Sequence, residues 1–320
     1  MNILIWHVHG SWTTSFVHGA HRYLIPVVED RGPDGRGRAR TWEWPAAAVE
    51  IRPEELADAE IDLVVVQRLR DVELFEQWAG GRRLGRDVPA IWLEHDAPQG
   101  RINDMRHPAA DRDDMAAVVH VTHTNDLFWA CGDVPTAVVE HGVVDPGERW
   151  TGDVEAIGVV INEPVRRARV TGTDLLPRFG QVGLVDLFGM RVDDLGDPGR
   201  PWLRTHEDLP QEKMHLELAR RRVYLHPFRW TSLGLALIEA MHLGMPVLAL
   251  ATTEAHDAVP AGCGIVSNDV ATLTAAAARL LADPAAGAEL GGAARAHALD
   301  RYGLDRFLAD WDQLLEDIIP

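Results

Sequence analysis

Short apolar runs recur along the first half of the chain, and polar or amphipathic stretches separate them. Continuous apolar runs of this length are typical of strands that are buried on both faces of a parallel sheet. Their alternation with helical stretches predicts repeated βα units and therefore a doubly wound α/β sheet. The apolar runs of this half occupy residues 2–8, 61–66, 90–93, 117–121 and 136–139.

A second series of apolar runs begins after the turn sequence Asp145-Pro146-Gly147. The break predicts two Rossmann-like domains, over residues 1–150 and 151–303. Doubly wound sheets bind ligands outside the carboxyl ends of their strands, so we expect the domains to face an interdomain cleft. Helical spacing of apolar residues predicts a last helix over 304–320, which could pack back on the N-terminal domain. The runs of this half occupy residues 156–161, 184–188, 223–225, 247–250 and 264–266.

The charge balance excludes one class of partner. The formal net charge of the 320 residues at pH 7 is −18, and Lys213 is the only lysine. Nucleic-acid backbones require a basic surface, so no nucleic-acid partner is expected. A phosphate group in a small substrate must therefore be met locally, by arginines or by backbone N–H groups.

The cysteines and the start of the chain bear on location. Cys131 and Cys263 lie far apart and form neither a metal-binding nor a disulfide-like pattern, which fits a reducing compartment. The first residues lack a basic segment followed by a long apolar core, and no apolar run reaches about 18 residues. The sequence predicts a cytoplasmic protein without a transmembrane segment, and it leaves the oligomeric state open.

The most informative segment runs from His226 to Val247. A strand ends at His226, and Thr231 or Ser232 could cap the helix that follows. The N–H groups at the start of such a helix form an anion site. Glu239 lies two turns further along this helix, and a carboxylate that accepts hydrogen bonds from vicinal hydroxyls is a common ribose contact.

This segment resembles the retaining GT-B glycosyltransferases, in particular glycosyltransferase family 4. The family signature reads roughly Glu-x-Phe-Gly-Leu-x-x-x-Glu-Ala-Met-x-x-Gly-x-Pro-Val, and this chain matches it at Gly234-Leu235, Glu239-Ala240-Met241 and Gly244-x-Pro246-Val247. The resemblance covers most of residues 155–305 and is looser in the N-terminal half. It implies a GT-B fold and transfer of a sugar from a nucleotide-diphosphate sugar, with the C-terminal domain binding the donor and the N-terminal domain the acceptor.

The resemblance also implies roles for residues in the C-terminal domain. Glu239 matches the second glutamate of the family motif, whereas the first glutamate aligns with Thr231 and is absent. Arg166 matches the arginine of the family's phosphate clamp, and Thr171 stands where that clamp has lysine, so Arg167 or Arg169 could supply the missing charge. The expected donor contacts in this domain are Arg166, Arg169, Thr231, Ser232, Leu233, Gly234, Leu235 and Glu239.

In the N-terminal domain the resemblance is carried by the opening strand and its loop. Gly10 and Ser11 match the loop near the donor phosphate and the acceptor, and His95 matches a histidine near the scissile bond. We therefore expect Gly10 and Ser11 to contact the donor, and Ser11, Trp12 and His95 to contact an acceptor that the sequence does not identify. His95, Arg166 and Arg169 are the expected catalytic residues. The reaction implied is retaining and needs neither metal nor cofactor, the donor being a substrate.

Less specific interpretations stay open for the same residues. The arginines at 166–169 could be an ordinary solvated surface, His95 a structural histidine, and Ser11 and Trp12 loop packing. The departures at Thr171 and Thr231 also fit a nucleotide-sugar-binding protein that no longer transfers. A metal-dependent hydrolase on a barrel is a further alternative, because His7 and His9 at the end of the first strand could share a metal.

Overall fold

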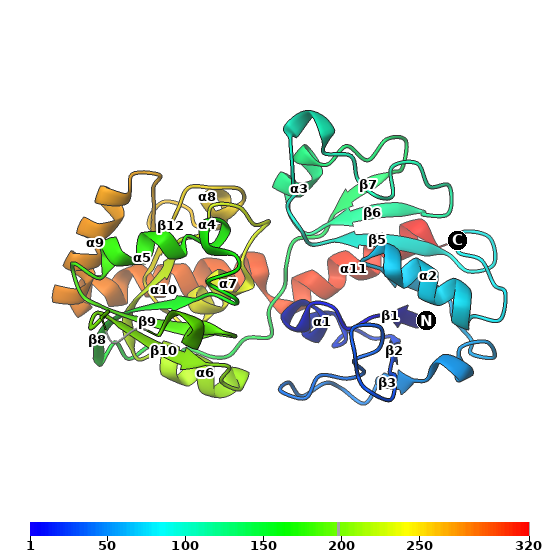
Figure 1. Cartoon of the computed structure of the whole chain (residues 1–320), viewed down its shortest axis with the longest axis horizontal. Coiled ribbons are helices and arrows are strands. Elements are labelled where there is room, and N and C mark those ends of the chain that lie inside the picture. The colour runs from blue at the N-terminus through cyan, green and yellow to red at the C-terminus, as the bar shows by residue number, and fades with distance from the viewer. Residues whose placement is uncertain (197–198, 320) are drawn as a thin grey trace. The chain divides into compact units, whose positions relative to one another are not determined.

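The computed structural model describes residues 1–196 and 199–319 of the chain, and these divide into two compact units. The N-terminal unit comprises Met1–Val144 together with the helix that begins at Leu304, and the C-terminal unit comprises Asp145–Gly303. The last helix thus returns to the unit in which the chain began (Figure 1). Each unit is built around one parallel sheet, which confirms the predicted fold class.

The N-terminal sheet has seven strands in the order β3-β2-β1-β4-β5-β6-β7, and all its neighbouring pairs are parallel. The order reverses direction between β1 and β4, as in a doubly wound fold. The first strand ends at Ile5, so the predicted run to Val8 is three residues too long. The strands are β1 (Asn2–Ile5), β2 (Arg22–Pro26), β3 (Ala48–Ile51), β4 (Leu63–Val66), β5 (Ala90–Glu94), β6 (Ala117–His120) and β7 (Thr136–Val138).

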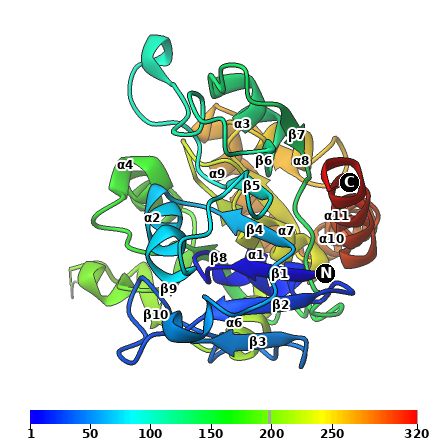
Figure 2. The same cartoon turned by 90° about the vertical axis from the view of Figure 1, so that its right-hand side faces the viewer.

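Helices cover both faces of this sheet, and Figure 2 shows α2 and α11 on opposite faces. The rings of Trp12 and Phe16 on α1 pack against Phe307 and Trp311 on α11, and these four side chains are buried. Burial of large aromatic surfaces explains why α11 returns to this unit. The helices are α1 (Gly10–Phe16), α2 (Leu69–Trp78), α3 (His123–Phe128) and α11 (Leu304–Ile318), with 3-10 turns η1 (Pro53–Glu55) and η2 (Ile102–Asp104).

The C-terminal sheet has six strands in the order β10-β9-β8-β11-β12-β13, again all parallel. This is the strand order of a Rossmann fold, and its direction reverses between β8 and β11. Strand β10 lies outside the predicted apolar runs, as do β2 and β3 of the N-terminal sheet. The strands are β8 (Val154–Val160), β9 (Leu184–Gly189), β10 (Leu203–Glu207), β11 (Arg221–His226), β12 (Val247–Ala249) and β13 (Ile265–Val266).

The helices of the C-terminal unit bury the two faces of its sheet. Phe179 of α5 and Leu273 of α9 share a core with Val185 and Leu187 of β9, and the alternate residues of β9 point to the other face. The helices are α4 (Ala168–Thr171), α5 (Leu176–Phe179), α6 (Gln211–Leu218), α7 (Leu235–His242), α8 (Ala255–Ala258), α9 (Val270–Ala282) and α10 (Pro284–Tyr302), with 3-10 turns η3 (Thr173–Leu175) and η4 (Val192–Leu195).

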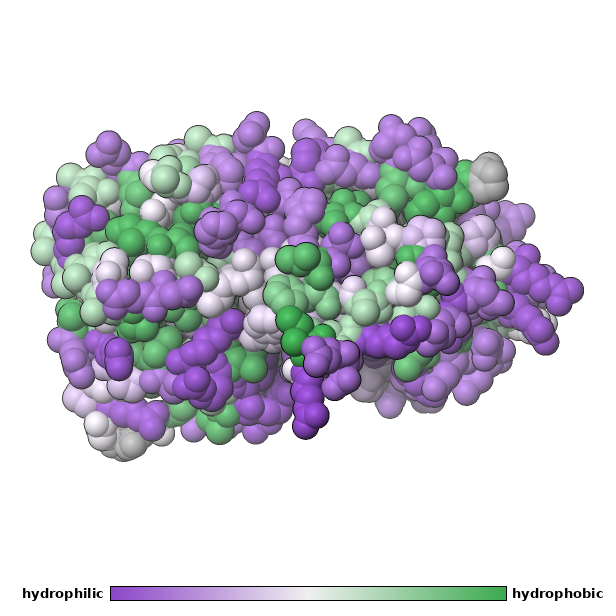
Figure 3. All heavy atoms as spheres, turned by 90° about the horizontal axis from the view of Figure 1, so that it is seen from above, coloured by the Kyte–Doolittle hydropathy of each residue, from purple (hydrophilic) through white to green (hydrophobic). Residues whose placement is uncertain are grey.

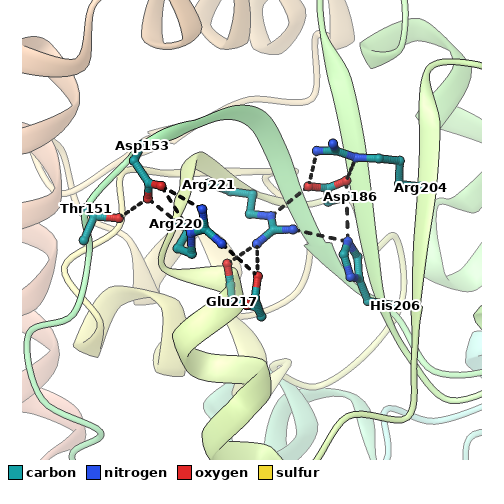
Figure 4. A network of polar contacts seen from close by, with 8 residues as sticks. All are labelled: Thr151, Asp153, Asp186, Arg204, His206, Glu217, Arg220 and Arg221. Carbon is teal, nitrogen blue, oxygen red and sulfur yellow. Dashed lines mark hydrogen bonds and ion pairs between the residues drawn. The ribbon is translucent and has the colours of Figure 1, made fainter.

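A buried carboxylate ties together three strands on the face of this sheet that α6 covers (Figure 4). Asp186 of β9 is fully buried and accepts hydrogen bonds from Arg204 of β10, at 2.5 and 2.7 Å, and from Arg221 of β11, at 2.7 Å. Strand β8 lies between β9 and β11, and its Gly158 is paired with Asp186 of β9. A Cβ at Gly158 would lie 2.6 Å from Cδ1 of Leu218 on α6 and 3.4 Å from Cβ of Arg221, so the missing side chain lets both residues pack closely on β8.

The surface is mixed in character. On the face drawn in Figure 3, polar and hydrophobic residues are interspersed. Across residues 1–196 and 199–319, no helix combines the length and the apolar character that crossing a bilayer requires.

The ion pairs of Asp186 lead to a stability prediction. Asp186→Ala leaves the guanidinium of Arg221, whose side chain is 5% exposed, without its buried carboxylate partner. Loss of one partner of a buried pair costs about 3–5 kcal/mol, so urea unfolding of the variant should begin at a clearly lower denaturant concentration. Asp153→Ala is the matched control, because Asp153 also pairs with an arginine, Arg220, but is half exposed and should change the midpoint little.

The same carboxylate should make stability depend on pH. Burial alone would raise the pKa of Asp186, but hydrogen bonds from His206, Arg204 and Arg221 outweigh burial and hold the pKa below its usual value. A carboxyl with a lowered pKa in the folded state stabilises the protein above the pKa of the unfolded chain and loses this effect as pH falls. The difference between wild type and Asp186→Ala should therefore shrink below about pH 4. An equal loss of stability in both aspartate variants would contradict the assignment.

Candidate functional site

The strand order of the C-terminal unit predicts where a ligand would bind. In open α/β sheets, ligands bind outside the carboxyl ends of the strands at the point where the strand order reverses. That point lies between β8 and β11. The loop after β8 covers 161–167 and the loop after β11 covers 227–234. These two loops contain most of the donor-binding residues that the sequence predicts for this unit.

The loops after β8, β9 and β10 carry unusual backbone conformations. Glu163, Arg191 and Asp208 have φ angles of 54°, 58° and 39° although none is a glycine. A fourth residue, Gly189, has a φ of 138°, and a Cβ there would lie 2.2 Å from the carbonyl oxygen of Ile161. For the three residues that carry a Cβ, such conformations cost about 1–3 kcal/mol each, and they cluster at ligand-binding sites. Their concentration at one edge of the sheet independently favours this edge as the candidate site.

Side chains of two residues hold these strained loops in place. The carboxylate of Glu207 accepts hydrogen bonds from the backbone N–H groups of Arg191 and Asp193, at 2.7 and 3.0 Å. Asn162 accepts one from the N–H of Met190 at 2.9 Å. Each bond joins a residue at or just beyond the end of one strand to the loop that follows the neighbouring strand. The three loops therefore form a connected rim at the carboxyl edge.

At the reversal point, the turn that follows α4 packs directly on the loop after β11. Gly172 ends α4 with a φ of 72°, and a Cβ there would lie 1.9 Å from the carbonyl oxygen of Pro227. The guanidinium of Arg229 spans the same junction, donating to both oxygens of Asp174 at 2.5 and 2.9 Å. Only glycine permits this approach, because any Cβ would separate the two loops.

The predicted phosphate contacts are exposed: Arg166 lies just before α4 and Arg169 lies on it. Arg166 forms an ion pair with Glu163, and Arg169 pairs with Asp174 at 3.1 Å. Thr171 is buried, and its hydroxyl lies 3.0 Å from that of Thr173. The position where the family clamp has lysine is thus part of the interior, whereas the two arginines are on the surface and can reach an anion by exchanging their present partners.

The predicted helix of the signature segment begins later than expected. It starts at Leu235 with Gly234 in the N-cap position, so the cap expected from Thr231 or Ser232 is wrong. Gly234 is needed there, because a Cβ would lie 2.5 Å from the ring of His226. Ser232 and Leu233 are buried, whereas Thr231, Gly234 and Leu235 are partly exposed. All five lie between the end of β11 and the first turn of α7.

Glu239, the predicted ribose contact, is buried on α7. Its Oε2 accepts a hydrogen bond from Gln211 Nε2 at 3.0 Å and lies 3.2 Å from His215 Nε2. Both partners come from α6, the helix that precedes β11. The carboxylate is therefore held in one orientation by a neighbouring helix, a relation that the signature segment alone did not reveal.

In the N-terminal unit, histidines gather at the carboxyl edge of the sheet. The rings of His9 and His95 are 4.0 Å apart, and Nε2 of His95 lies 3.1 Å from Oε1 of Gln67. Burial lowers the pKa of His95 well below its usual value, and the nearby His9 and His141 lower it further. Burial also brings the pKa of His141 to about 3. These imidazoles are neutral at physiological pH.

The predicted acceptor and donor contacts of α1 differ in exposure. Gly10 and Ser11 are partly exposed at the start of the helix, whereas Trp12 is fully buried and its ring lies edge-on to His95, 5.1 Å away. The indole supports the histidine from within the core. Packing thus accounts for Trp12, and an open acceptor contact by its ring does not fit this burial.

The hydrolase alternative is wrong. The chain forms two parallel sheets and not a barrel, and β1 ends at Ile5, before His7 and His9. His7 Nδ1 lies 2.9 Å from the carbonyl oxygen of Gly37, and the ring of His9 is against His95. In the part of the chain that the structure describes, no group of three or more histidine, cysteine or carboxylate side chains is arranged to hold a metal.

Several residues of this region escaped the sequence analysis. Asn162, Glu207 and Arg229 hold loops of the C-terminal unit, and Gln67 contacts His95. Single polar residues after strands carry no distinctive pattern. The one available signal was position, because Asn162 and Gln67 directly follow apolar runs whose carboxyl ends were predicted.

Two Rossmann-type units with these strand orders define the GT-B architecture, and comparisons with known proteins agree. Residues 202–283 match the family model described as glycosyl transferases group 1. Sucrose-phosphate synthase from Thermosynechococcus elongatus has a TM-score of 0.71 at 16% identity, covering 99% of this chain and 98% of that one. The likeness shows that the chain has the GT-B fold.

Two further solved structures support the same fold. HepE of Anabaena, solved in complex with UDP and glucose, has a TM-score of 0.70 at 13% identity and covers 99% of this chain and 100% of its own. A glycosyltransferase from Rickettsia africae has a TM-score of 0.69 at 12% identity and covers 99% of this chain and 98% of its own. No curated protein matches this chain significantly.

The contact between the two loops at Gly172 predicts a specific sensitivity. Gly172→Ala puts a Cβ into the carbonyl oxygen of Pro227 and forces a left-handed φ on alanine, so it should destabilise the C-terminal unit by at least about 2 kcal/mol. Gly292→Ala is the matched control, because a Cβ there meets nothing on the exposed side of α10 and should stabilise by about 0.5–1 kcal/mol. Thermal unfolding of both variants measures the difference, and similar midpoints would contradict the packing.

Proposed function

We propose that this protein is a glycosyltransferase that moves a sugar from a nucleotide-diphosphate donor to an acceptor of unknown identity. The observation that carries the proposal is the strained and hydrogen-bonded rim formed by the loops after β8, β9 and β10. This rim adjoins the reversal point, where the loops after β8 and β11 carry residues that resemble the family 4 donor site. The match of residues 202–283 to a glycosyltransferase family model supports the same assignment.

The C-terminal unit supplies the groups that a nucleotide diphosphate requires. Arg166 and Arg169 are exposed cations beside the reversal point, and guanidinium groups bind phosphate oxygens in pairs. The first N–H groups of α7, beginning at Leu235, add partial positive charge without an ion. Glu239, held by Gln211, would accept hydrogen bonds from the ribose hydroxyls.

The chemistry proposed is loss of the nucleoside diphosphate from the anomeric carbon while an acceptor oxygen attacks. The leaving phosphate gains negative charge as the bond breaks, and fixed cations and N–H groups stabilise that charge more strongly than they stabilise the bound donor. We propose that arginines and the start of α7 serve this purpose in place of a metal. Attack by the acceptor oxygen on the same face of the sugar from which the leaving group departs would retain the anomeric configuration.

On the acceptor side we propose the carboxyl edge of the N-terminal sheet, with His95 as the principal contact and Gly10 and Ser11 beside it. Because its pKa is lowered, His95 stays neutral and can exchange hydrogen bonds with hydroxyl groups without attracting phosphate. This property suits a group that contacts the sugar or the acceptor.

A second candidate is a nucleotide-sugar-binding protein without transfer activity. It is favoured by two observations: Thr231 offers no carboxylate to the transferred sugar, and the buried Thr171 cannot replace the clamp lysine. Binding of a donor without any turnover would establish it.

The donor site is tested by thermal unfolding in the presence of UDP, GDP, ADP, TDP and CDP and their sugar conjugates. A ligand present at about 100 times its Kd stabilises the folded state by about 2.7 kcal/mol, which should raise Tm by about 5 °C for the correct base. Glu239→Ala should abolish this shift, because the ribose loses its carboxylate.

The control for this screen is Gln211→Ala. Both variants remove the hydrogen bond between Gln211 and Glu239, at 3.0 Å in the wild type, but only Glu239→Ala removes the carboxylate. The ligand-induced shift should survive in Gln211→Ala. A shift as large as that of the wild type in both variants would show that Glu239 does not contact the nucleotide. The absence of any shift in the wild type would contradict the proposed function.

Retention and metal independence are tested together with water as the acceptor. Slow hydrolysis of the stabilising nucleotide sugar should release the sugar first in the anomeric form of the donor, visible by proton NMR before the anomers equilibrate. The rate should be unchanged in excess EDTA. Release of the opposite anomer would exclude retention, and loss of turnover in EDTA would show that a metal replaces the proposed role of the arginines.

A further inference from the structure

The imidazole of His7 has one ring nitrogen engaged and one open. His7 lies two residues after β1 and is partly exposed, and its Nδ1 is 2.9 Å from the backbone carbonyl oxygen of Gly37. A carbonyl oxygen can only accept, so Nδ1 donates. Burial lowers the pKa of His7 more than this hydrogen bond raises it, so the ring is neutral at physiological pH. A neutral imidazole holds one proton, and Nε2 is therefore an acceptor, without a hydrogen-bond partner among the described residues.

The loop that follows β2 also holds this imidazole in place. The ring of Trp44 lies 4.9 Å from that of His7, and the buried indole of Trp44 donates to Thr14 Oγ1 on α1 at 2.8 Å. The guanidinium of Arg38 donates to the carbonyl oxygens of Trp44 and Pro45, at 2.6 and 3.0 Å. The loop is thus tied to its own backbone and to α1, and the open nitrogen of His7 has a fixed position.

A small space beside Gly10 adjoins His7 and a second polar group. A Cβ at Gly10 would lie 3.6 Å from Nε2 of His7 and 3.8 Å from Nε1 of Trp42, which are ordinary van der Waals distances. Trp42 is partly exposed, and its indole N–H has no hydrogen-bond partner in the part of the chain that the structure describes. Gly10 begins α1 without a positive φ, so neither the backbone nor the packing requires a glycine. Its missing side chain leaves room next to one acceptor and one donor.

The combination of an acceptor with a donor selects the kind of group that can bind. A hydroxyl donates its proton to one atom and accepts from another, so it can satisfy Nε2 of His7 and the N–H of Trp42 together. A phosphate oxygen would accept from Trp42 but would face the lone pair of Nε2. Among hydroxyl compounds a sugar ring fits best, because an indole also offers an apolar face to the C–H groups of the ring.

We propose that His7 and Trp42 bind a hydroxyl of a neutral sugar acceptor, so that the acceptor of this protein is a carbohydrate. The inference rests on the proposed function for the reaction, whereas binding of the sugar belongs to the N-terminal unit and is measurable without a donor. His7 and Trp42 lie in the loops after β1 and β2, which are neighbours in the sheet. Both loops therefore lie at the carboxyl edge, where ligands of such sheets bind.

Binding is tested on the full chain with ¹⁵N-labelled tryptophan and no nucleotide. The indole N–H signal of Trp42 is identified by its absence in Trp42→Phe. The probes are the methyl glycosides of glucose, galactose, mannose and N-acetylglucosamine, and at least one should shift this signal to saturation. No shift with any of them would overturn the proposal. An equal or larger response to glucose 6-phosphate would also overturn it, by indicating anion binding near Arg36, whose charge reaches His7.

Two variants alter the space without removing the reporter indole. His7→Asn keeps an N–H for the carbonyl of Gly37 but lacks Nε2, and Gly10→Ala fills the space with a methyl group. Each should weaken glycoside binding about tenfold or more, the factor that corresponds to one lost hydrogen bond. Gly10→Ala should unfold at the same or a higher temperature, because alanine is favoured over glycine in a helix. Unchanged glycoside affinity in both variants would contradict the site.

Transfer separates the acceptor from the donor sugar, which also carries hydroxyl groups. With the glycoside that binds most tightly, kcat/KM for transfer should fall about tenfold in Trp42→Phe, and more than hydrolysis of the same nucleotide sugar by water. Trp78→Phe is the matched control and should behave as the wild type, because this partly exposed indole at the end of α2 likewise has no hydrogen-bond partner among the described residues. An equal fall in transfer and hydrolysis would assign the pair to the donor sugar and overturn the proposal.

The titration and the turnover measurement also separate this sugar site from the proposed function. Glycoside binding at Trp42 without any turnover would contradict the transferase and leave the sugar site in place. Transfer to a glycoside that does not shift the Trp42 signal would leave the transferase in place and overturn the role of His7 and Trp42.

Discussion

The parallel arrangement of the strands is the constraint on which the candidate sites depend. When all strands of a sheet run in one direction, every loop that follows a strand lies at the same edge, however far apart the loops are in sequence. In the N-terminal unit this brings together residues that follow β1, β4, β5 and β7, among them His9, Gln67, His95 and His141. In the C-terminal unit it joins the loops after β8, β9 and β10 into one rim. The chemistry thus comes from single residues that the topology assembles.

The rim of the C-terminal sheet is held in conformations that the chain would not adopt alone. Left-handed φ angles at Glu163 and Arg191 are unfavourable for residues with a Cβ. Compensation comes from side chains such as Glu207, whose carboxylate accepts from two backbone N–H groups. The rest of the cost of these φ angles must be offset elsewhere in the unit. The buried ion pairs of Asp186 contribute to this, because they join three strands of the same sheet. A rigid sheet can therefore support a strained edge.

The sequence predicted the sheets better than it predicted the contacts between their loops. Continuous apolar runs identified most strands but missed β2, β3 and β10. The last of these was missed because Leu203–Glu207 carries charged residues, one of which, Arg204, is bound to Asp186. The signature segment located α7 and Glu239 correctly on one helix. It gave no information about Gln211, because that partner lies on another helix. The cap expected at Thr231 or Ser232 was wrong because the contact between Gly234 and His226, a tertiary feature, decides where α7 begins.

The two units differ in the charge that they can offer to a substrate, and this difference follows from burial. Arg166 and Arg169 are on the surface of an otherwise strongly acidic chain, where a guanidinium stays charged and can exchange a carboxylate partner for a phosphate. The histidines of the N-terminal unit are buried, and their lowered pKa values keep them uncharged. Under the proposed function this division has a chemical reason. Cations near the leaving phosphate promote bond breaking, whereas a cation beside the sugar would oppose the positive charge that develops at the anomeric carbon. Neutral imidazoles can bind hydroxyl groups there without that cost.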